Sequence, residues 1–296
     1  MKIDFISDLH VDSHFHETTL LYEKGKGPQH FNSRGEFQYF DFEWFKTPDS
    51  SVLVIAGDIS NNIAVSCKVL EQASEHYDFV IFTDGNHEHY NLSITYMPCV
   101  DIETTNNVFD NIDIIKEFIK SNPKLIYLDG VENLHFTLDN ITFLGGNSWY
   151  DWSALIPYGY SYEDNYKAWQ THMKDAKRID FKYVNPEVLA NEFVRDVEKF
   201  LKTNTNEIVL VTHTSPLVLL HSIIPENFDY NALTSSFINS KLADVLDENV
   251  KTCLYGHTHD HKDLVLSNTR FVNNAYGYPH EFKKRGWKMK QITIGE

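Results

Sequence analysis

Cysteine is scarce in this chain. There are three, Cys67, Cys99 and Cys253, an odd number with no spacing typical of a metal site. Disulfide-stabilised domains carry paired cysteines, and cysteine-based zinc sites carry them at short, regular intervals. The pattern therefore disfavours both classes. It fits a reducing compartment and predicts a cytoplasmic protein.

Long apolar runs are also absent. No stretch approaches the roughly 18 consecutive apolar residues that suggest a membrane-spanning helix. The chain does not begin with a basic segment followed by an apolar one, and Lys2 leads directly into a short apolar run at residues 3–6. We therefore expect neither a membrane segment nor a removable targeting segment.

Basic residues are too few to favour nucleic acid as a general partner. The chain has 26 lysines and arginines against 42 aspartates and glutamates, which gives a formal net charge of −16. Such a charge repels a phosphate backbone at long range, so binding to duplex nucleic acid is disfavoured. The short run Lys283-Lys284-Arg285 could form a local basic patch, but a solvated surface turn is the favoured interpretation.

The remaining composition is that of an ordinary globular protein. Of the 296 residues, 42% are hydrophobic and 23% are charged, and we find no internal repeat or linker-like segment. The length is sufficient for a large core. We therefore predict one domain over residues 1–296. A cap-like insertion is expected within about residues 90–205, where two of the motifs described below are widely separated.

Five apolar runs stop at residues that can bind metal ions. Buried strands of α/β proteins read as short apolar runs, and ligands gather in the loops at their carboxyl ends. The runs are residues 3–6 before Asp8-Leu9-His10, 52–56 before Gly57-Asp58, 79–82 before Gly85-Asn86-His87-Glu88, 208–211 before His213, and 252–255 before Gly256-His257-Thr258-His259.

The rest of the chain alternates helices and strands first and forms hairpins later. A helix from Asn61 or Asn62 to about Tyr77 lies between two of the strands and predicts a parallel βαβ unit. Asp139-Asn140 predicts a tight hairpin turn. Residues 11–47 are expected to be mainly loop. Further helices are expected at 111–120, 186–202 and 235–249, and further strands at 125–128, 134–138, 141–144, 263–266, 269–272 and 289–294.

Oxygen and nitrogen donors dominate the strand ends. Two divalent ions could share them if one carboxylate, most naturally that of Asp58, bridges both. Mixed imidazole and carboxylate ligands suit manganese, iron or zinc rather than calcium, and we expect manganese to support activity in vitro. The candidate metal ligands are Asp8, His10, Asp58, Asn86, His213, His257 and His259.

His87 and Glu88 are the candidate catalytic residues. His87 directly follows a candidate ligand, so we expect its side chain to point toward substrate. As an imidazolium it could stabilise developing negative charge or protonate a leaving alkoxide. Glu88 is expected to orient the His87 ring and to keep its pKa up.

These motifs, in this order, resemble the motif set of the calcineurin-like metallophosphoesterases from residue 4 to about residue 280. The segments 143–151 and 274–279 resemble more closely a bacterial and phage group of predicted phosphohydrolases. The resemblance implies a four-layer αββα sandwich of two mixed β-sheets flanked by helices, and attack on phosphorus by a metal-bridging hydroxide. It also implies a first metal site of Asp8, His10, Asp58 and His259, and a second of Asp58, Asn86, His213 and His257.

Two positions depart from the family pattern. Thr214 stands where close relatives often have a second histidine, and Ala275 stands where they have a basic residue. Both family residues could contact substrate phosphate. The substrate preference of relatives therefore does not carry over, although the metal ligands do.

The resulting expectation is a metal-dependent hydrolase of a small, nucleotide-like phosphodiester or phosphomonoester. A nuclease acting on single-stranded nucleic acid is the alternative, and a catalytically silent protein-binding scaffold is a third reading. The scaffold is disfavoured because no ligand or active histidine is missing. The aromatic residues between Trp149 and Trp169 could stack on a base, but filling a core is the favoured role.

Overall fold

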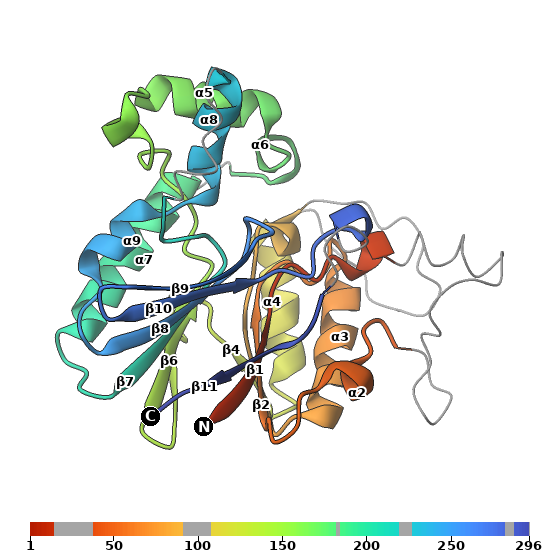
Figure 1. The fold of residues 1–296 in the computed structure, drawn as a ribbon. Coiled ribbons are helices and arrows are strands. Elements are labelled where there is room, and N and C mark those ends of the chain that lie inside the picture. The colour runs from red at the N-terminus through yellow and green to blue at the C-terminus, as the bar shows by residue number, and fades with distance from the viewer. Residues whose placement is uncertain (15–37, 91–107, 182–183, 219–226, 282–286, 296) are drawn as a thin grey trace, which may run out of the picture.

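Two β-sheets packed face to face form the centre of the protein. The computed structural model describes residues 1–14, 38–90, 108–181, 184–218, 227–281 and 287–295. Helices cover the outer face of each sheet, so the molecule has four layers, helix, sheet, sheet and helix (Figure 1). This is the predicted αββα sandwich. The run at residues 283–285 and most of the expected loop at 11–47 lie outside the described residues.

The first sheet has the strand order β11-β1-β2-β3-β4. Strands β1 to β4 run parallel, and β11 pairs antiparallel with β1. Its outer face is covered by three helices, α2, α3 and α4. The strands are β1 (Lys2–Ile6), β2 (Val52–Ala56), β3 (Phe79–Thr83), β4 (Leu125–Tyr127) and β11 (Lys290–Thr293), and the helices are α2 (Phe42–Phe45), α3 (Ile63–His76) and α4 (Val108–Ile119).

The second sheet has the order β5-β6-β7-β8-β10-β9. Its four inner strands run parallel, and each edge strand pairs antiparallel with its neighbour. The helices α7 and α9 cover its outer face. The elements are β5 (His135–Leu138), β6 (Ile141–Gly146), β7 (Glu207–Thr212), β8 (Val250–Tyr255), β9 (His261–Leu266), β10 (Thr269–Asn274), α7 (Pro186–Leu201) and α9 (Ser240–Val245).

The core between the sheets explains why the sequences of the strands are continuously apolar. Strand β2 is buried along its whole length, since one face packs on helices and the other on the second sheet. Residues 54, 81, 209, 211 and 254 meet in the middle layer with full burial. Strands β1, β2 and β3 run parallel in the first sheet, and β7 and β8 run parallel in the second. The motif-bearing loops that follow them meet at one edge of the sandwich.

Most predicted elements are present with ends that differ by a few residues, but the helix expected at 235–249 is wrong. The chain instead forms α8 (Phe228–Thr234), a 3₁₀ turn η4 (Ser235–Phe237) and then α9. Between them Ile238 bridges Ser215, and the buried Asn239 amide donates to the Ser148 carbonyl at 2.7 Å. These long-range contacts outweigh the helical pattern and break the helix at this point.

Three short helices, α5 (Tyr162–His172), α6 (Asp175–Arg178) and α8, lie above the carboxyl ends of the strands and are called the upper helices below (Figure 1). Two of them lie within residues 90–205, whereas α8 comes from a later part of the chain. Other short turns are η1 (His87–His89) and η2 (Ile156–Tyr158). No described helix has the length and apolar character needed to cross a membrane.

An aromatic cluster forms the small core beneath the upper helices. Trp152, 1% exposed, packs edge-to-face on Tyr150 and Tyr166, with ring centroids 5.9 and 4.9 Å away, and tilted against Trp169 at 5.1 Å. The rings therefore contact one another. This agrees with the core-filling role that the sequence favoured for residues 149–169.

We predict that Trp152→Ala loosens the upper helices and leaves the two sheets intact. Removing a buried tryptophan costs roughly 3–5 kcal/mol of folding free energy. Hydrogen exchange of the α5 amides should therefore accelerate while that of β2 and β7 does not. The matched control is Tyr158→Ala, since Tyr158 is 46% exposed. Unchanged exchange in α5 would show that the cluster does not hold the upper helices in place.

Candidate metal centre

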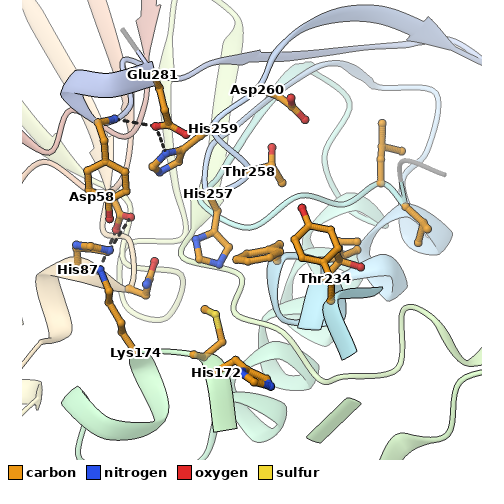
Figure 2. A pocket seen from close by; sticks show the side chains of 18 of the residues that line it. Asp58, His87, His172, Lys174, Thr234, His257, Thr258, His259, Asp260 and Glu281 are labelled. Carbon is orange, nitrogen blue, oxygen red and sulfur yellow. Dashed lines mark hydrogen bonds and ion pairs between the residues drawn. The ribbon is translucent and has the colours of Figure 1, made fainter. Parts of the chain in front are cut away.

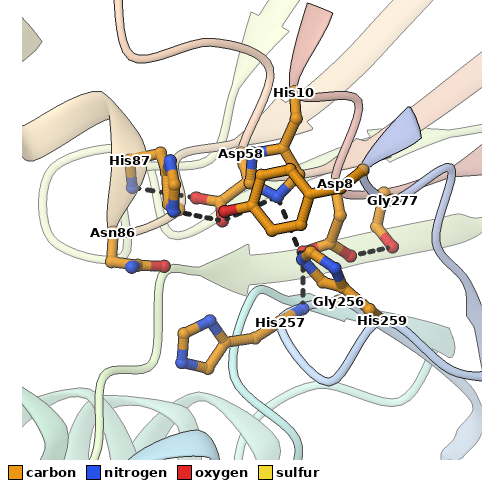
Figure 3. Close-up of polar contacts among 12 residues, drawn as sticks. Asp8, His10, Asp58, Asn86, His87, Gly256, His257, His259 and Gly277 are labelled. Carbon is orange, nitrogen blue, oxygen red and sulfur yellow. Dashed lines mark hydrogen bonds and ion pairs between the residues drawn. The ribbon is translucent and has the colours of Figure 1, made fainter. Parts of the chain in front are cut away.

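All seven candidate ligands converge at the edge where the motif-bearing strands end. Figure 3 shows six of them, and His213 is the seventh. They form two groups whose donor atoms lie within 4.8 Å of one another, and Asp58 belongs to both. The first group is Asp8, His10, Asp58 and His259, and the second is Asp58, His213 and His257. Asn86 adds a neutral oxygen to the second group.

The first group contains three close contacts. Nε2 of His10 lies 2.9 Å from Nε2 of His259, and the latter lies 3.5 Å from Oδ1 of Asp8. Oδ2 of Asp58 is 3.7 Å from the His10 nitrogen. Two imidazole nitrogens and two carboxylates therefore face one small volume, which is the donor chemistry of a transition-metal site.

The second group is centred on His213. Its Nε2 lies 3.0 Å from Oδ1 of Asn86, 3.1 Å from Nδ1 of His257 and 3.4 Å from Oδ1 of Asp58. The two oxygens of Asp58 thus face different groups, Oδ2 the first and Oδ1 the second. This is the arrangement needed for one carboxylate to bridge two ions.

Outer hydrogen bonds fix the orientation of three histidines. Nδ1 of His213 donates to the Ala56 carbonyl at 2.9 Å, and Nε2 of His257 donates to the Ser236 carbonyl at 3.2 Å. Nδ1 of His259 donates to Oε2 of Glu281 at 2.8 Å. In each ring the proton is held on the far nitrogen, which leaves the near nitrogen free for a metal ion. The residues therefore fit a pair of divalent ions.

The loops reach this geometry through left-handed backbone conformations. Five of the seven candidate ligands have a positive φ, between 42° at His10 and 65° at His257. Such residues cost of order 1–3 kcal/mol each and persist only when the surrounding structure holds them. The strain turns each side chain from the strand direction into the common site. The five are Asp8, His10, Asp58, His257 and His259.

Glycine is required at two positions beside these ligands. Gly57 has a φ of 77°, and a Cβ there would lie 2.5 Å from Nδ1 of His213. A Cβ on Gly85 would collide with Oδ1 of Asp58 and would lie 2.6 Å from the Asp58 amide nitrogen. These glycines therefore let the β2 and β3 loops approach closely enough to place Asp58 between the groups.

Burial and neighbouring charges shift the titration of these residues. Burial lowers the pKa of His10 and of His257. Burial also opposes a charge on His213, but the Asp58 carboxylate outweighs it and raises the pKa of His213 to about 10. For Asp58 itself, His213 and His87 outweigh burial and lower its pKa. A proton and a metal ion thus compete for the His213 nitrogen.

His87 lies beside the two groups and belongs to neither. Its Nε2 is 3.8 Å from Oδ2 of Asp58, and its Nδ1 donates to Oδ1 of Asn61 at 2.6 Å. The Asn61 amide is fixed in turn by Asp12, to which its Nδ2 donates at 2.6 Å. The Asp12–Asn61 pair therefore orients the ring and directs Nε2 toward the site.

The expected role of Glu88 is wrong. Its carboxylate accepts the backbone N–H groups of Gly85 and of residues 58–60 at 2.8–3.2 Å, and so holds the β2 and β3 loops together. The ring of His87 is oriented by Asn61 instead. Burial lowers the pKa of His87, and the carboxylates that oppose this shift belong to Asp58, Asp175 and Asp12.

Asp175 is a functional residue that the sequence did not reveal. It is fully buried at the start of α6, and its Oδ1 accepts from Nδ2 of Asn86 at 2.8 Å and from the Tyr90 hydroxyl at 2.7 Å. Its Oδ2 accepts from the Tyr150 hydroxyl at 2.7 Å. Holding the Asn86 amide nitrogen turns Oδ1 of Asn86 toward His213. No local motif marks Asp175, which lies 89 positions from Asn86.

A cavity of about 690 Å³ opens beside the two groups (Figure 2). Asp58, His87, His257 and His259 form its polar end. The upper helices and the segments next to them form the opposite wall. That wall includes Leu155, His172, Met173, Lys174, Leu217, Val218, Tyr230, Thr234, Phe237 and Ile238.

A four-layer sandwich with two histidine and carboxylate groups that share an aspartate defines a dinuclear metallohydrolase. The sequence model of the calcineurin-like phosphoesterases matches residues 1–261. The chain therefore belongs to this family and is a metal-dependent phosphoric ester hydrolase.

Known proteins similar to the chain include one viral sequence and several solved structures. An uncharacterized protein, L509, of Acanthamoeba polyphaga mimivirus is 24% identical over 282 residues, which cover 94% of this chain and 91% of that protein. Phosphopantetheinyl hydrolase from Mycobacterium tuberculosis superposes with a TM-score of 0.72 at 18% identity, covering 99% of this chain and 96% of the other. A dimetal phosphatase from Danio rerio has a TM-score of 0.45 at 12% identity, covering 100% and 93%.

We predict that Asp175→Asn weakens one metal site without unfolding the protein. Loss of an outer contact typically lowers metal affinity about 10- to 100-fold. The variant should therefore retain one ion per chain and lose the second during dialysis, as measured by inductively coupled plasma mass spectrometry. Asp113→Asn is the matched control because Asp113 is exposed on α4. Two retained ions in Asp175→Asn would contradict the assigned role.

Proposed function

We propose that the chain hydrolyses a small phosphomonoester or phosphodiester, of nucleotide-like size, at a centre of two divalent ions. Asp8, His10, Asp58 and His259 would hold the first ion, and Asn86, His213 and His257 would join Asp58 around the second. The observation that carries the proposal is the position of Asp58, which faces both groups and lines the cavity.

When bound, the ions would supply an activated water nucleophile and neutralise charge on the phosphoryl group. The chain's own residues set the geometry of the reaction. Asp58 fixes the separation of the two groups because each of its oxygens faces a different one. His213 and His257 are held by backbone carbonyls, so their ligand atoms are positioned before substrate arrives.

His87 is placed to handle the leaving oxygen. Asn61 accepts the Nδ1 proton, so Nε2 is the atom that faces the cavity. In the imidazolium form Nε2 carries the second proton of the ring and can give that proton or a hydrogen bond to substrate. A positioned acid of this kind typically contributes about 10²- to 10⁴-fold to the rate. Its side chain is only 8% exposed, which keeps bulk water from competing for that contact.

The cavity supports a small substrate over a nucleic-acid strand. Its volume of about 690 Å³ lies in the range of pockets that enclose a small molecule. Aromatic side chains of Tyr230, Phe237 and Tyr278 line it and could stack on a planar group such as a base. The structurally similar mycobacterial protein is named as a hydrolase of phosphopantetheinyl groups, which are also small phosphoesters.

The proposed activity can be tested with a screen of phosphorylated metabolites and cyclic nucleotides. We expect protein stripped of metal by a chelator to be inactive. It should regain hydrolysis of p-nitrophenyl phosphate or bis-p-nitrophenyl phosphate when manganese, zinc or iron is added, but not when calcium is added. Asp58→Asn is the control against a contaminating phosphatase. A labelled single-stranded oligonucleotide tests the nuclease alternative. Failure to hydrolyse any of these with both ions bound would favour the scaffold reading.

We predict that His87→Ala lowers kcat about 100-fold or more and leaves both ions bound. The decrease should be larger for an alkyl phosphate than for a p-nitrophenyl ester, because p-nitrophenolate leaves without help from an acid. Asn61→Ala should have a smaller effect of the same kind, since it frees the ring without removing it. Steady-state kinetics and metal content measure both variants. Unchanged turnover in His87→Ala would exclude His87 from the chemistry.

A further inference from the structure

Lys174 brings a positive charge to the mouth of the cavity. It precedes α6 and lines the cavity, and Figure 2 shows its side chain extending toward His87 and Asp58. Among the described residues, Lys262 is the other lysine that lines the cavity. Lys262 lies on β9, two positions after Asp260, which Figure 2 places across the cavity from Lys174.

The Lys174 ammonium has no carboxylate partner among the described residues. Its contact is with the ring of Tyr278, whose centroid is 5.9 Å from Nζ. The same ring stacks on His10 with centroids 4.3 Å apart and planes inclined by 17°. The charge therefore lies 5.9 Å from the centre of a ring that also contacts His10 of the first metal group. An anion placed beside it would meet the three N–H donors of the ammonium.

The backbone at Lys174 is tied to the metal centre. The next residue, Asp175, is fully buried and is held by Asn86, Tyr90 and Tyr150. A surface lysine normally has no such anchor.

The basic residues of α6 itself have different contacts. Nζ of Lys177 donates to the Thr171 carbonyl at 3.0 Å, and the Arg178 guanidinium lies 5.5 Å from the Tyr90 centroid. Of these three basic residues, Lys174, which immediately precedes the helix, is the one that lines the cavity.

We propose that Lys174 is a substrate-binding residue whose ammonium contacts a non-bridging oxygen of the phosphoryl group. The proposal rests on the phosphoesterase function above. Thr214 and Ala275 are buried and uncharged, so neither supplies this contact. Lysine binds phosphate as a compact charge with three donors. Because a monoester dianion carries one more charge than a diester, the contribution of Lys174 is larger for monoesters.

Phosphate binding measured apart from turnover tests the proposal. The protein is loaded with manganese and freed of excess metal, and its Kd for inorganic phosphate is measured by isothermal titration calorimetry. Lys174→Met keeps the aliphatic stem and removes the charge, and Lys174→Arg restores the charge. Lys177→Met is the matched control on the same helix. Metal content and kcat/KM for p-nitrophenyl phosphate and bis-p-nitrophenyl phosphate are measured for each protein.

We expect Lys174→Met to weaken phosphate binding about 10- to 100-fold, as for loss of a charge-assisted hydrogen bond. Its kcat/KM should fall further for the monoester than for the diester. Lys174→Arg should recover most of the affinity, and Lys177→Met should resemble the parent protein.

Two results would overturn the proposal: a Kd in Lys174→Met within about twofold of the parent, or weakened binding that merely follows loss of metal ions. The outcome is separate from that of the proposed function. If the parent protein binds phosphate but hydrolyses no ester, the phosphoesterase proposal fails while the Kd values still decide the role of Lys174.

Discussion

The carboxylate of Asp58 is the contact on which the site depends. Its Oδ1 accepts the His87 backbone N–H at 2.9 Å and lies 3.4 Å from His213, while Oδ2 lies 3.7 Å from His10. One side chain therefore fixes the spacing of two groups, each of which takes residues from both sheets. This position requires the absence of a Cβ at Gly85 and a clamp between the β2 and β3 loops, which Glu88 provides.

The sandwich supplies the rigidity that such a site needs. Five candidate ligands have left-handed backbone conformations, and together these oppose folding by several kcal/mol at the usual magnitude per residue. The strands that precede them, of which β2 is buried along its whole length, offset this strain through apolar burial on both faces. Because the strands are parallel, they deliver the strained loops to one edge. The candidate metal centre thus lies at the point where the buried strands end.

The sequence was most informative where local pattern and chemistry coincide. An apolar run that ends at a polar residue specifies a strand and its exit together, and the seven donors predicted in this way lie close together in the structure. The roles of Asp175, Asn61 and Glu281 were not predicted, because each depends on a hydrogen bond across the fold. The role expected for Glu88 is wrong for the same reason. Its position next to His87 suggested that it orients the His87 ring, but the Glu88 carboxylate instead accepts backbone N–H groups of the β2 and β3 loops. The prediction of a single helix at 235–249 is wrong because the long-range contacts of Ile238 and Asn239 interrupt the helix.

Two adjacent residues at the start of α6, one of the upper helices, connect the wall of the cavity with the metal centre. Asp175 turns inward and holds Asn86, while Lys174 turns toward the cavity. The contact between Asp175 and Asn86 constrains the backbone at this point, so the exposed Lys174 side chain begins from a fixed position beside the cavity. The opposite wall is not uniform in this respect. Phe237 packs edge-to-face on His257, with ring centroids 5.0 Å apart, and so is also connected to a candidate ligand. Tyr230 on α8 lines the same cavity but is 43% exposed, so it can change, and with it the group attached to phosphate, while Asp175 and Phe237 keep their contacts with Asn86 and His257.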